Sequence, residues 1–161
     1  MRFYLALKDF FKIYKFPVLS GVLFGCSFIP FPFFFLFFCL VPLWLFIYHQ
    51  NSLKQVLTAC FITQFIATFI GFNWMIYTFH FFGGMNWFLS FILLLLFCAT
   101  ANCYVMISGW LCFVFVKRGS VNSAPVKLLL FPLVFSVLHS LIPTLFPWNM
   151  GYPWFWGGLW G

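Results

Sequence analysis

The sequence predicts an all-α protein, a polytopic transmembrane helical bundle with about five membrane passes. Of its 161 residues, 65% are hydrophobic and only 6% are charged. A soluble surface needs roughly a quarter to a third charged residues, so this chain is suited to lipid rather than to water. Apolar runs separated by short polar or basic segments recur along the whole chain. We therefore expect residues 1–161 to form a single membrane domain.

The first two passes are short and are separated by the segment Pro30-Phe31-Pro32. They cover residues 16–29 and 33–48, and each is shorter than the roughly 20 residues that a spanning helix needs. We expect a helical hairpin that turns at the prolines. The remaining passes are expected over about residues 56–72, within residues 87–116 and over about residues 126–143. The fourth run is long enough to cross the membrane with a tilt.

The basic residues fall on one side of this topology. All eight lie before the first pass, between the second and third, or between the fourth and fifth, at Arg2, Lys8, Lys12, Lys15, Lys54, Lys117, Arg118 and Lys127. Because cytoplasmic loops are rich in Lys and Arg, the N-terminus is expected in the cytoplasm and the C-terminus outside. The net charge of +7 does not indicate nucleic-acid binding, since it is spread over three short segments rather than one basic stripe.

The three segments expected outside are 28–32, 73–87 and 146–160, and the last two are rich in tryptophan, glycine and asparagine. Together with the adjoining run that contains Trp110, they hold seven of the eight tryptophans. Interfacial anchoring alone is one interpretation of these rings. The glycines, prolines and asparagines among them favour a shaped surface at the outer leaflet.

Three motifs in these segments occur in the order of a known family. They are Phe28-x-Pro30-Phe31 with Leu40-Val41-Pro42-Leu43, then Gly71-x-Asn73-Trp74 with Phe82-Gly83-Gly84, and then Phe146-Pro147-Trp148-Asn149-x-Gly151-Tyr152. On these motifs, over about residues 20–152, the chain resembles the N-terminal membrane domain of apolipoprotein N-acyltransferase. The strongest pieces are the Trp followed by a Gly-Gly loop and the Phe-Pro-Trp that ends in Gly-Tyr.

The resemblance implies a bacterial inner-membrane enzyme of lipoprotein maturation. In that family a nitrilase-like domain outside the membrane carries a Glu, a Lys and a Cys, and the Cys passes an acyl chain from a phospholipid to the amine of a lipidated N-terminal cysteine. The implied partners are a phospholipid acyl donor, a lipidated apolipoprotein and, where a separate chain supplies it, a nitrilase-like domain. This chain is expected to stop before that domain, as a fragment, a split-enzyme subunit or a degenerate homologue. It also departs from the family at Leu138-His139-Ser140, where a Glu followed by a Trp is common.

The candidate site is a groove at the outer leaflet that admits lipid chains. Its expected lining is Asn73, Trp74, His80, Gly83, Gly84, Phe146, Pro147, Trp148, Asn149, Gly151 and Tyr152. His80 is placed there to meet a phosphate headgroup or a substrate amine, and His139 is a candidate because ionisable groups within a membrane are often functional. A hydrogen-bonded structural role is the favoured interpretation of both histidines. No cofactor is expected, and three dispersed histidines without carboxylates do not fit a zinc site.

The chain is expected to lack catalytic chemistry of its own. Its six cysteines lie in apolar runs, where a neutral buried thiol is the usual state, and its single acid, Asp9, is expected in the cytoplasm. The segment Leu23-Phe24-Gly25-Cys26 has the layout of a lipoprotein signal peptide, but Phe24 is bulky for the cleavage site and further spans follow. A second function class stays open, namely a noncatalytic membrane scaffold, lipid-binding protein or small transporter subunit. The midspan polar groups that a transporter needs are few: Gln64, Asn102 and His139.

Overall fold

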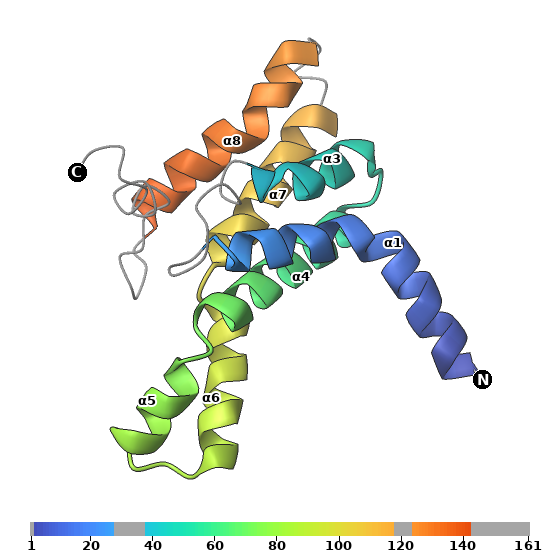
Figure 1. Ribbon diagram of the computed structural model, residues 1–161. Helices are drawn as coiled ribbons and strands as arrows, with labels where there is room; N and C mark the ends of the chain where they lie inside the picture. Colours follow the sequence, from blue (N-terminus) through green and yellow to red (C-terminus); the bar gives the residue numbers. More distant parts are fainter. Residues whose placement is uncertain (1, 28–37, 118–123, 143–161) are drawn as a thin grey trace.

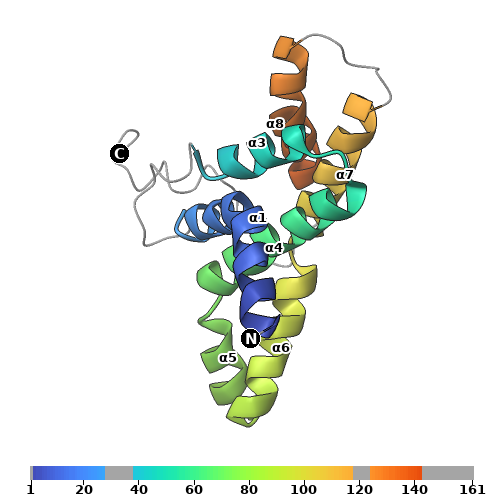
Figure 2. The same ribbon diagram turned by 90° about the vertical axis from the view of Figure 1, so that its right-hand side faces the viewer.

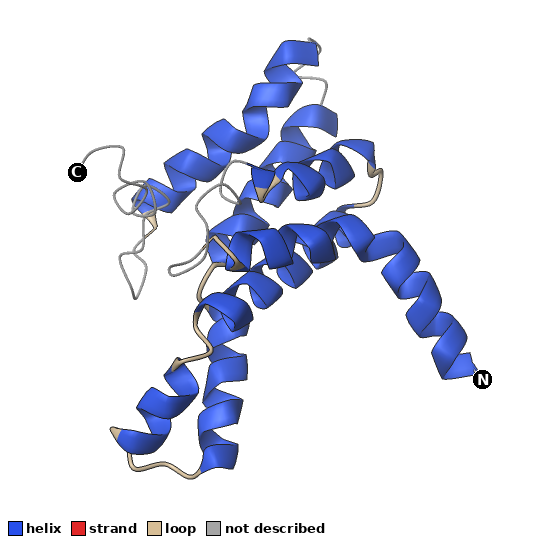
Figure 3. Ribbon diagram, viewed as in Figure 1, coloured by secondary structure: helices blue, strands red, loops and turns tan. Residues whose placement is uncertain are grey.

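The computed structural model describes residues 2–27, 38–117 and 124–142. Within these ranges all regular structure is helical and no strand occurs, which confirms the predicted all-α class (Figure 3). In chain order the helices are α1 (Arg2–Gly25), α3 (Val41–His49), α4 (Leu53–Gly71), α5 (Met75–Phe81), α6 (Trp87–Thr100), α7 (Cys103–Lys117) and α8 (Ala124–Leu141) (Figure 1). Two stretches of the described chain are long and apolar enough to cross a membrane, Leu53–Gly71 and Trp87–Lys117.

Helix α1 is bent near its middle. Tyr14 has φ of −98° and ψ of 17°, which is not a helical conformation. Pro17 accounts for the bend, because it lacks the N–H that would bond the carbonyl one turn earlier and its ring crowds that carbonyl. The half of α1 that follows the bend lies against the other helices, and the half before it extends away from them (Figure 1 and Figure 2).

The second half of α1 lies against α4 at two glycines. A Cβ on Gly21 would stand 2.9 Å from the Cβ of Ile66, and a Cβ on Gly25 would stand 2.7 Å from the Cβ of Ile70. Small residues four positions apart allow membrane helices to approach closely in this way. Gly21 meets Ile66 and Gly25 meets Ile70, so residue numbers increase in the same direction along both helices. The two helices therefore run parallel.

Helix α3 runs back along α1 in the opposite direction. The hydroxyl of Ser20 donates a hydrogen bond to the carbonyl of Cys39. Nearer the N-terminus of α1, the ring of Tyr14 lies 5.8 Å from the ring of Phe46. Lower numbers on α1 therefore meet higher numbers on α3, and the pair is antiparallel. Residues 30–32, where the predicted hairpin turns, lie outside the described residues.

The apolar run of α6 and α7 is interrupted at Ala101 and Asn102, and α4 supplies polar contacts at the interruption. The side-chain amide of Gln64 donates to the carbonyl of Ala99 at 3.0 Å. The side-chain amide of Asn102 donates to the hydroxyl of Thr68 at 2.6 Å. Gln64 and Thr68 are four residues apart, so both face the same side of α4. These two hydrogen bonds satisfy polar groups at the interruption between α6 and α7.

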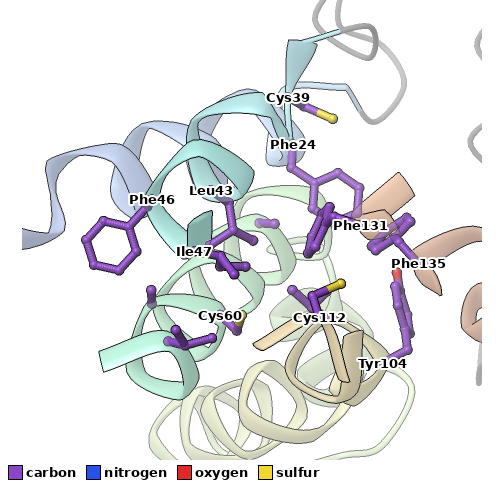
Figure 4. Close-up of a cluster of buried hydrophobic side chains, with 14 residues drawn as sticks. Phe24, Cys39, Leu43, Phe46, Ile47, Cys60, Tyr104, Cys112, Phe131 and Phe135 are labelled. Carbon is purple, nitrogen blue, oxygen red and sulfur yellow. The ribbon is translucent and has the colours of Figure 1, made fainter. Parts of the chain in front are cut away.

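The core lies where α1, α3, α4, α7 and α8 meet. Figure 4 shows side chains from these five helices that converge on one another. Tyr104 of α7 packs against Phe135 of α8 with ring centroids 5.4 Å apart. Among the described residues of this core, the largest fully buried apolar side chains are Phe24, Leu43, Val56 and Val105.

The structure differs from the predicted spans in four places. Helix α3 begins at Val41, after a turn at residues 39 and 40, within the run 33–48 that was expected to form one pass. The first helix begins at Arg2 rather than at residue 16 and ends at Gly25. The segment 73–87, which was taken as an outer loop, contains α5. The single helix expected within residues 87–116 is divided into α6 and α7. The apolar runs predicted where helices occur, but turns and contacts with other helices set the helix boundaries.

Candidate functional site

The segment 73–100 folds into a helical hairpin that we call the aromatic arm. It consists of α5, the turn that follows α5, and α6 (Figure 1). The two helices are joined on their facing sides by a small apolar cluster of Met75, Leu94 and Cys98. In both views the tip of the arm stands clear of the remaining helices (Figure 1 and Figure 2).

Two glycines make the turn of the aromatic arm. Gly84 has a φ of +63°, in the left-handed region that residues with a Cβ adopt only at a cost. A Cβ on Gly83 would stand 2.6 Å from the carbonyl oxygen of Phe79, so that position has no room for a side chain. The backbone N–H of Met85 then donates to the same Phe79 carbonyl at 3.3 Å. The Phe-Gly-Gly motif is thus a tight turn whose two glycines are needed for different reasons.

His80 holds this turn closed. Its Nδ1 lies 2.6 Å from the carbonyl oxygen of Met85 and donates a hydrogen bond to it. The imidazole also stacks on the indole of Trp87, with centroids 4.0 Å apart and planes inclined by 24°. When the ring is neutral and Nδ1 carries the proton, Nε2 carries the lone pair and can accept a hydrogen bond. His80 therefore has a structural role in the turn, and its Nε2 atom can still accept one hydrogen bond.

The outer surface of the aromatic arm is apolar and aromatic. Phe82 is 89% exposed and Phe81 is 68% exposed, and Tyr77, Trp87 and Phe88 are exposed as well. Tyr77 and Phe81 both approach the Trp87 ring edge-on, at 5.7 and 6.1 Å between centroids. An exposed aromatic patch of this kind marks a surface for lipid or for a partner.

Asn73 and Trp74 lie at the opposite end of α5 from the glycine turn. The side-chain amide of Asn73 donates a hydrogen bond to the carbonyl oxygen of Ile70 at 2.8 Å. This bond satisfies a carbonyl in the last turn of α4. The ring of Trp74 lies 6.3 Å from that of Phe72. With about 1.5 Å of rise per residue, the seven residues of α5 separate this pair from Gly83 by about 10 Å. The structure therefore brings His80, Gly83 and Gly84 together and leaves Asn73 and Trp74 one helix length away.

The third predicted part of the groove cannot be placed beside these residues. It comprises Phe146, Pro147, Trp148, Asn149, Gly151 and Tyr152, all of which lie outside the described residues.

The described side chains offer little covalent chemistry. Cys39, Cys60, Cys98 and Cys112 are buried, and a neutral thiol is the usual state of a buried cysteine. Only Cys103 is exposed. Across the described residues no group of three His, Cys, Asp or Glu side chains is arranged to hold a metal ion. The exposed rings of the aromatic arm can pack against apolar molecules, but the arm holds no carboxylate and its one cysteine, Cys98, is buried.

Sequence reasoning gave little weight to the polar contacts between α4 and the start of α7. Gln64 is fully buried and its Oε1 has no hydrogen-bond partner among the described residues. His139 likewise has two buried ring nitrogens without a described partner, and its ring lies 5.1 Å from that of Tyr104. The available signal was the i, i+4 spacing of Gln64 and Thr68 in an otherwise apolar run. Nothing in the local sequence indicates that Asn102 meets them.

Comparison with known proteins supplies the family. The model of the apolipoprotein N-acyltransferase N-terminal domain matches residues 20–160, which is most of the chain. The chain belongs to this family. Among curated proteins, it is 37% identical over 148 residues to the apolipoprotein N-acyltransferase of Bdellovibrio bacteriovorus. That match covers 89% of this chain and 26% of the relative, so the chain spans about a quarter of the relative's length. No solved structure matches the chain.

Membership of the apolipoprotein N-acyltransferase family confirms the resemblance drawn from the motifs. The matched residues include the glycine turn of the aromatic arm and the Phe-Pro-Trp segment. Together with the two apolar stretches long enough to span a bilayer, this supports a membrane protein related to acyltransferases.

Proposed function

We propose that this chain is the membrane part of an apolipoprotein N-acyltransferase of the bacterial inner membrane. In this role it takes part in transfer of a phospholipid acyl chain to the N-terminal amine of a lipidated apolipoprotein. The match of the family's N-terminal domain over residues 20–160 is the observation that carries the proposal. The Glu, Lys and Cys that do the chemistry are supplied by a nitrilase-like domain outside residues 1–161.

The proposed topology has five passes, with the N-terminus in the cytoplasm and the C-terminus in the periplasm. The directions of the helices support it, since α1 and α3 run antiparallel and α1 and α4 run parallel. Thr68 meets Asn102, whereas the earlier Cys60 meets the later Gly109, so α4 and α7 run antiparallel. Alternating directions of this kind are what a chain that recrosses a bilayer requires. The Pro-turned hairpin joining the first two passes is part of this proposal.

The length of the run formed by α6 and α7 supports an outer position for the tip of the aromatic arm. Its 31 residues measure about 46 Å, against a hydrocarbon core of about 30 Å. With Lys117 at the cytoplasmic surface, the other end of the run reaches the outer headgroups. The exposed rings at the tip then lie where aromatic side chains are favoured in membranes.

Within the enzyme, the aromatic arm serves the acyl-transfer site by shape and contact. Its exposed rings pack on acyl chains or on the catalytic domain, and Nε2 of His80 can accept a hydrogen bond from a substrate amine. The segment Phe146–Tyr152, with Trp148 next to Pro147, is proposed to complete this groove. The arm leaves the covalent steps to the nitrilase-like domain because its one cysteine, Cys98, is buried and it holds no carboxylate.

A chimaera tests this role. Residues 1–161 are joined to the remaining C-terminal part of the Bdellovibrio relative, and N-acylation of a diacylated lipopeptide is measured per folded molecule. Phe82→Ala is expected to lower the rate, since Phe82 is 89% exposed at the tip of the arm. Leu133→Ala is the matched control, because Leu133 is a large apolar side chain, 61% exposed on α8. Equal rates for both variants and the parent would show that the arm serves only as a membrane anchor.

A further inference from the structure

A pocket opens between α3, α7 and α8, away from the aromatic arm. It is a shallow groove that is partly open to the surface rather than a closed cavity. Its walls are apolar and aromatic, with Trp44 from α3, Val116 from α7 and Leu130 from α8 among them. Apolar and aromatic walls with a few polar groups at the edge are the lining expected of a site for an apolar ligand.

The mouth of the pocket carries a positive charge without a negative partner. Lys117, the last residue of α7, lines the pocket together with Gln50 and Tyr48. The ammonium of Lys117 donates a hydrogen bond to the side-chain oxygen of Asn51, which is neutral. The chain's single acid is Asp9, and none of the described side chains is a carboxylate. The charge at the mouth is thus left for an external anion.

We propose that this pocket binds an anionic phospholipid of the cytoplasmic leaflet. One acyl chain lies between Trp44, Val116 and Leu130, and the phosphate of the headgroup meets Lys117 at the mouth. A long lysine side chain can lie along apolar walls and keep its ammonium at the headgroup level. Basic pockets between transmembrane helices on the cytoplasmic side are recognised positions for anionic lipid headgroups. The leaflet assignment rests on the proposed topology, whereas the binding chemistry does not.

This site is distinct from the proposed acyl-transfer groove, both in place and in role. Lys117 and Trp87 are the two end residues of the 31-residue run formed by α6 and α7. The bound lipid would join α3, α7 and α8, because its chain contacts all three. It would therefore stabilise the bundle rather than serve as acyl donor.

Native mass spectrometry of the delipidated chain in neutral detergent tests the site. Dioleoyl phosphatidylglycerol is expected to bind more tightly than dioleoyl phosphatidylcholine, which has the same chains and no net charge. Lys117→Gln is expected to weaken phosphatidylglycerol binding about fivefold and to leave phosphatidylcholine binding unchanged. Lys12→Gln is the matched control, because it removes the same charge from an exposed position on α1.

The position of the bound lipid is tested separately from the preference of the site for an anionic headgroup. Phosphatidylglycerol with a photoreactive acyl chain is expected to label peptides that contain Trp44, Val116 or Leu130. Equal binding of the two lipids, an equal loss in Lys12→Gln, or labelling elsewhere would overturn the proposal. So would displacement of phosphatidylglycerol by millimolar inorganic phosphate, because a bound acyl chain should resist it. None of these outcomes bears on acyl transfer, which is measured in the chimaera.

Discussion

At the scale of single residues, the turn of the aromatic arm depends on the backbone of Gly84. No atom lies within 4 Å of a Cβ placed there, so a side chain at this position would meet open space. The constraint is the φ of +63°, which costs an L-residue about 1–2 kcal/mol. Gly83 differs, because there the carbonyl of Phe79 fills the place of a Cβ.

Gly84→Val is therefore expected to lower the free energy of unfolding by about 1–2 kcal/mol. Gly84→Asn should cost clearly less, because Asn visits the left-handed region more readily than other residues. The measurement is unfolding of the detergent-solubilised chain, followed by circular dichroism. Equal losses in the two variants would show that bulk, rather than backbone conformation, matters at this position.

Part of the candidate site could be predicted from the sequence, namely the part that is local. His80 meets the Met85 carbonyl and the Trp87 ring, both within seven residues of it in the chain. The sequence also grouped Asn73 and Trp74 with this turn. They lie one helix length away, because residues 75–81 form a helix where a loop was expected.

At the scale of helices, the close contact between α1 and α4 depends on Gly21 and Gly25, which have no side chains. Gly25→Val is expected to destabilise the bundle by about 1–3 kcal/mol, since added methyls would meet Ile70 and force the helices apart. Leu19→Ala, on the exposed face of the same helix, should have little effect. Thermal unfolding in detergent measures both changes. If Gly25→Val melted like the parent, α1 and α4 would not approach as closely as the structure has them.

The polar contact at the interruption between α6 and α7 provides a second test at this scale. A double-mutant cycle of Thr68→Val and Asn102→Leu is expected to give a coupling of about 0.6–1.7 kcal/mol, the range found for hydrogen bonds between membrane helices. The 2.6 Å hydrogen bond between the two side chains is the reason. A coupling of zero, with both single variants folded, would mean that these side chains do not interact.

The positions of helices could be predicted where the local amino-acid composition determines them. They could not be predicted where contacts with distant residues determine them. The apolar runs of α4 and α8 were expected close to where they lie, because hydropathy alone sets them. The interruption at Ala101 and Asn102 contains neither Gly nor Pro, so no local signal marks it. It coincides with Gln64 and Thr68, which are more than 30 residues away in the chain.

At the scale of the whole molecule, the alternating helix directions fit the proposed topology, and the distribution of basic residues predicts which side is cytoplasmic. Alkaline phosphatase fused after Gly161 is expected to be active, because that end is proposed to lie in the periplasm. A fusion at Ser120, between α7 and α8, is expected to be inactive. The opposite pair of activities would invert the topology and place the aromatic arm in the cytoplasm.

We propose that this chain shapes and positions an acyl-transfer reaction whose chemistry is carried out by a nitrilase-like domain. The most direct test is N-acylation of a diacylated lipopeptide by purified protein in phospholipid micelles. Residues 1–161 alone are expected to give no product, because four of the six cysteines are buried as neutral thiols and the chain holds a single acid. The same residues joined to the C-terminal part of the Bdellovibrio relative are expected to give product. Product from residues 1–161 alone, lost on substitution of one cysteine, would contradict the claim.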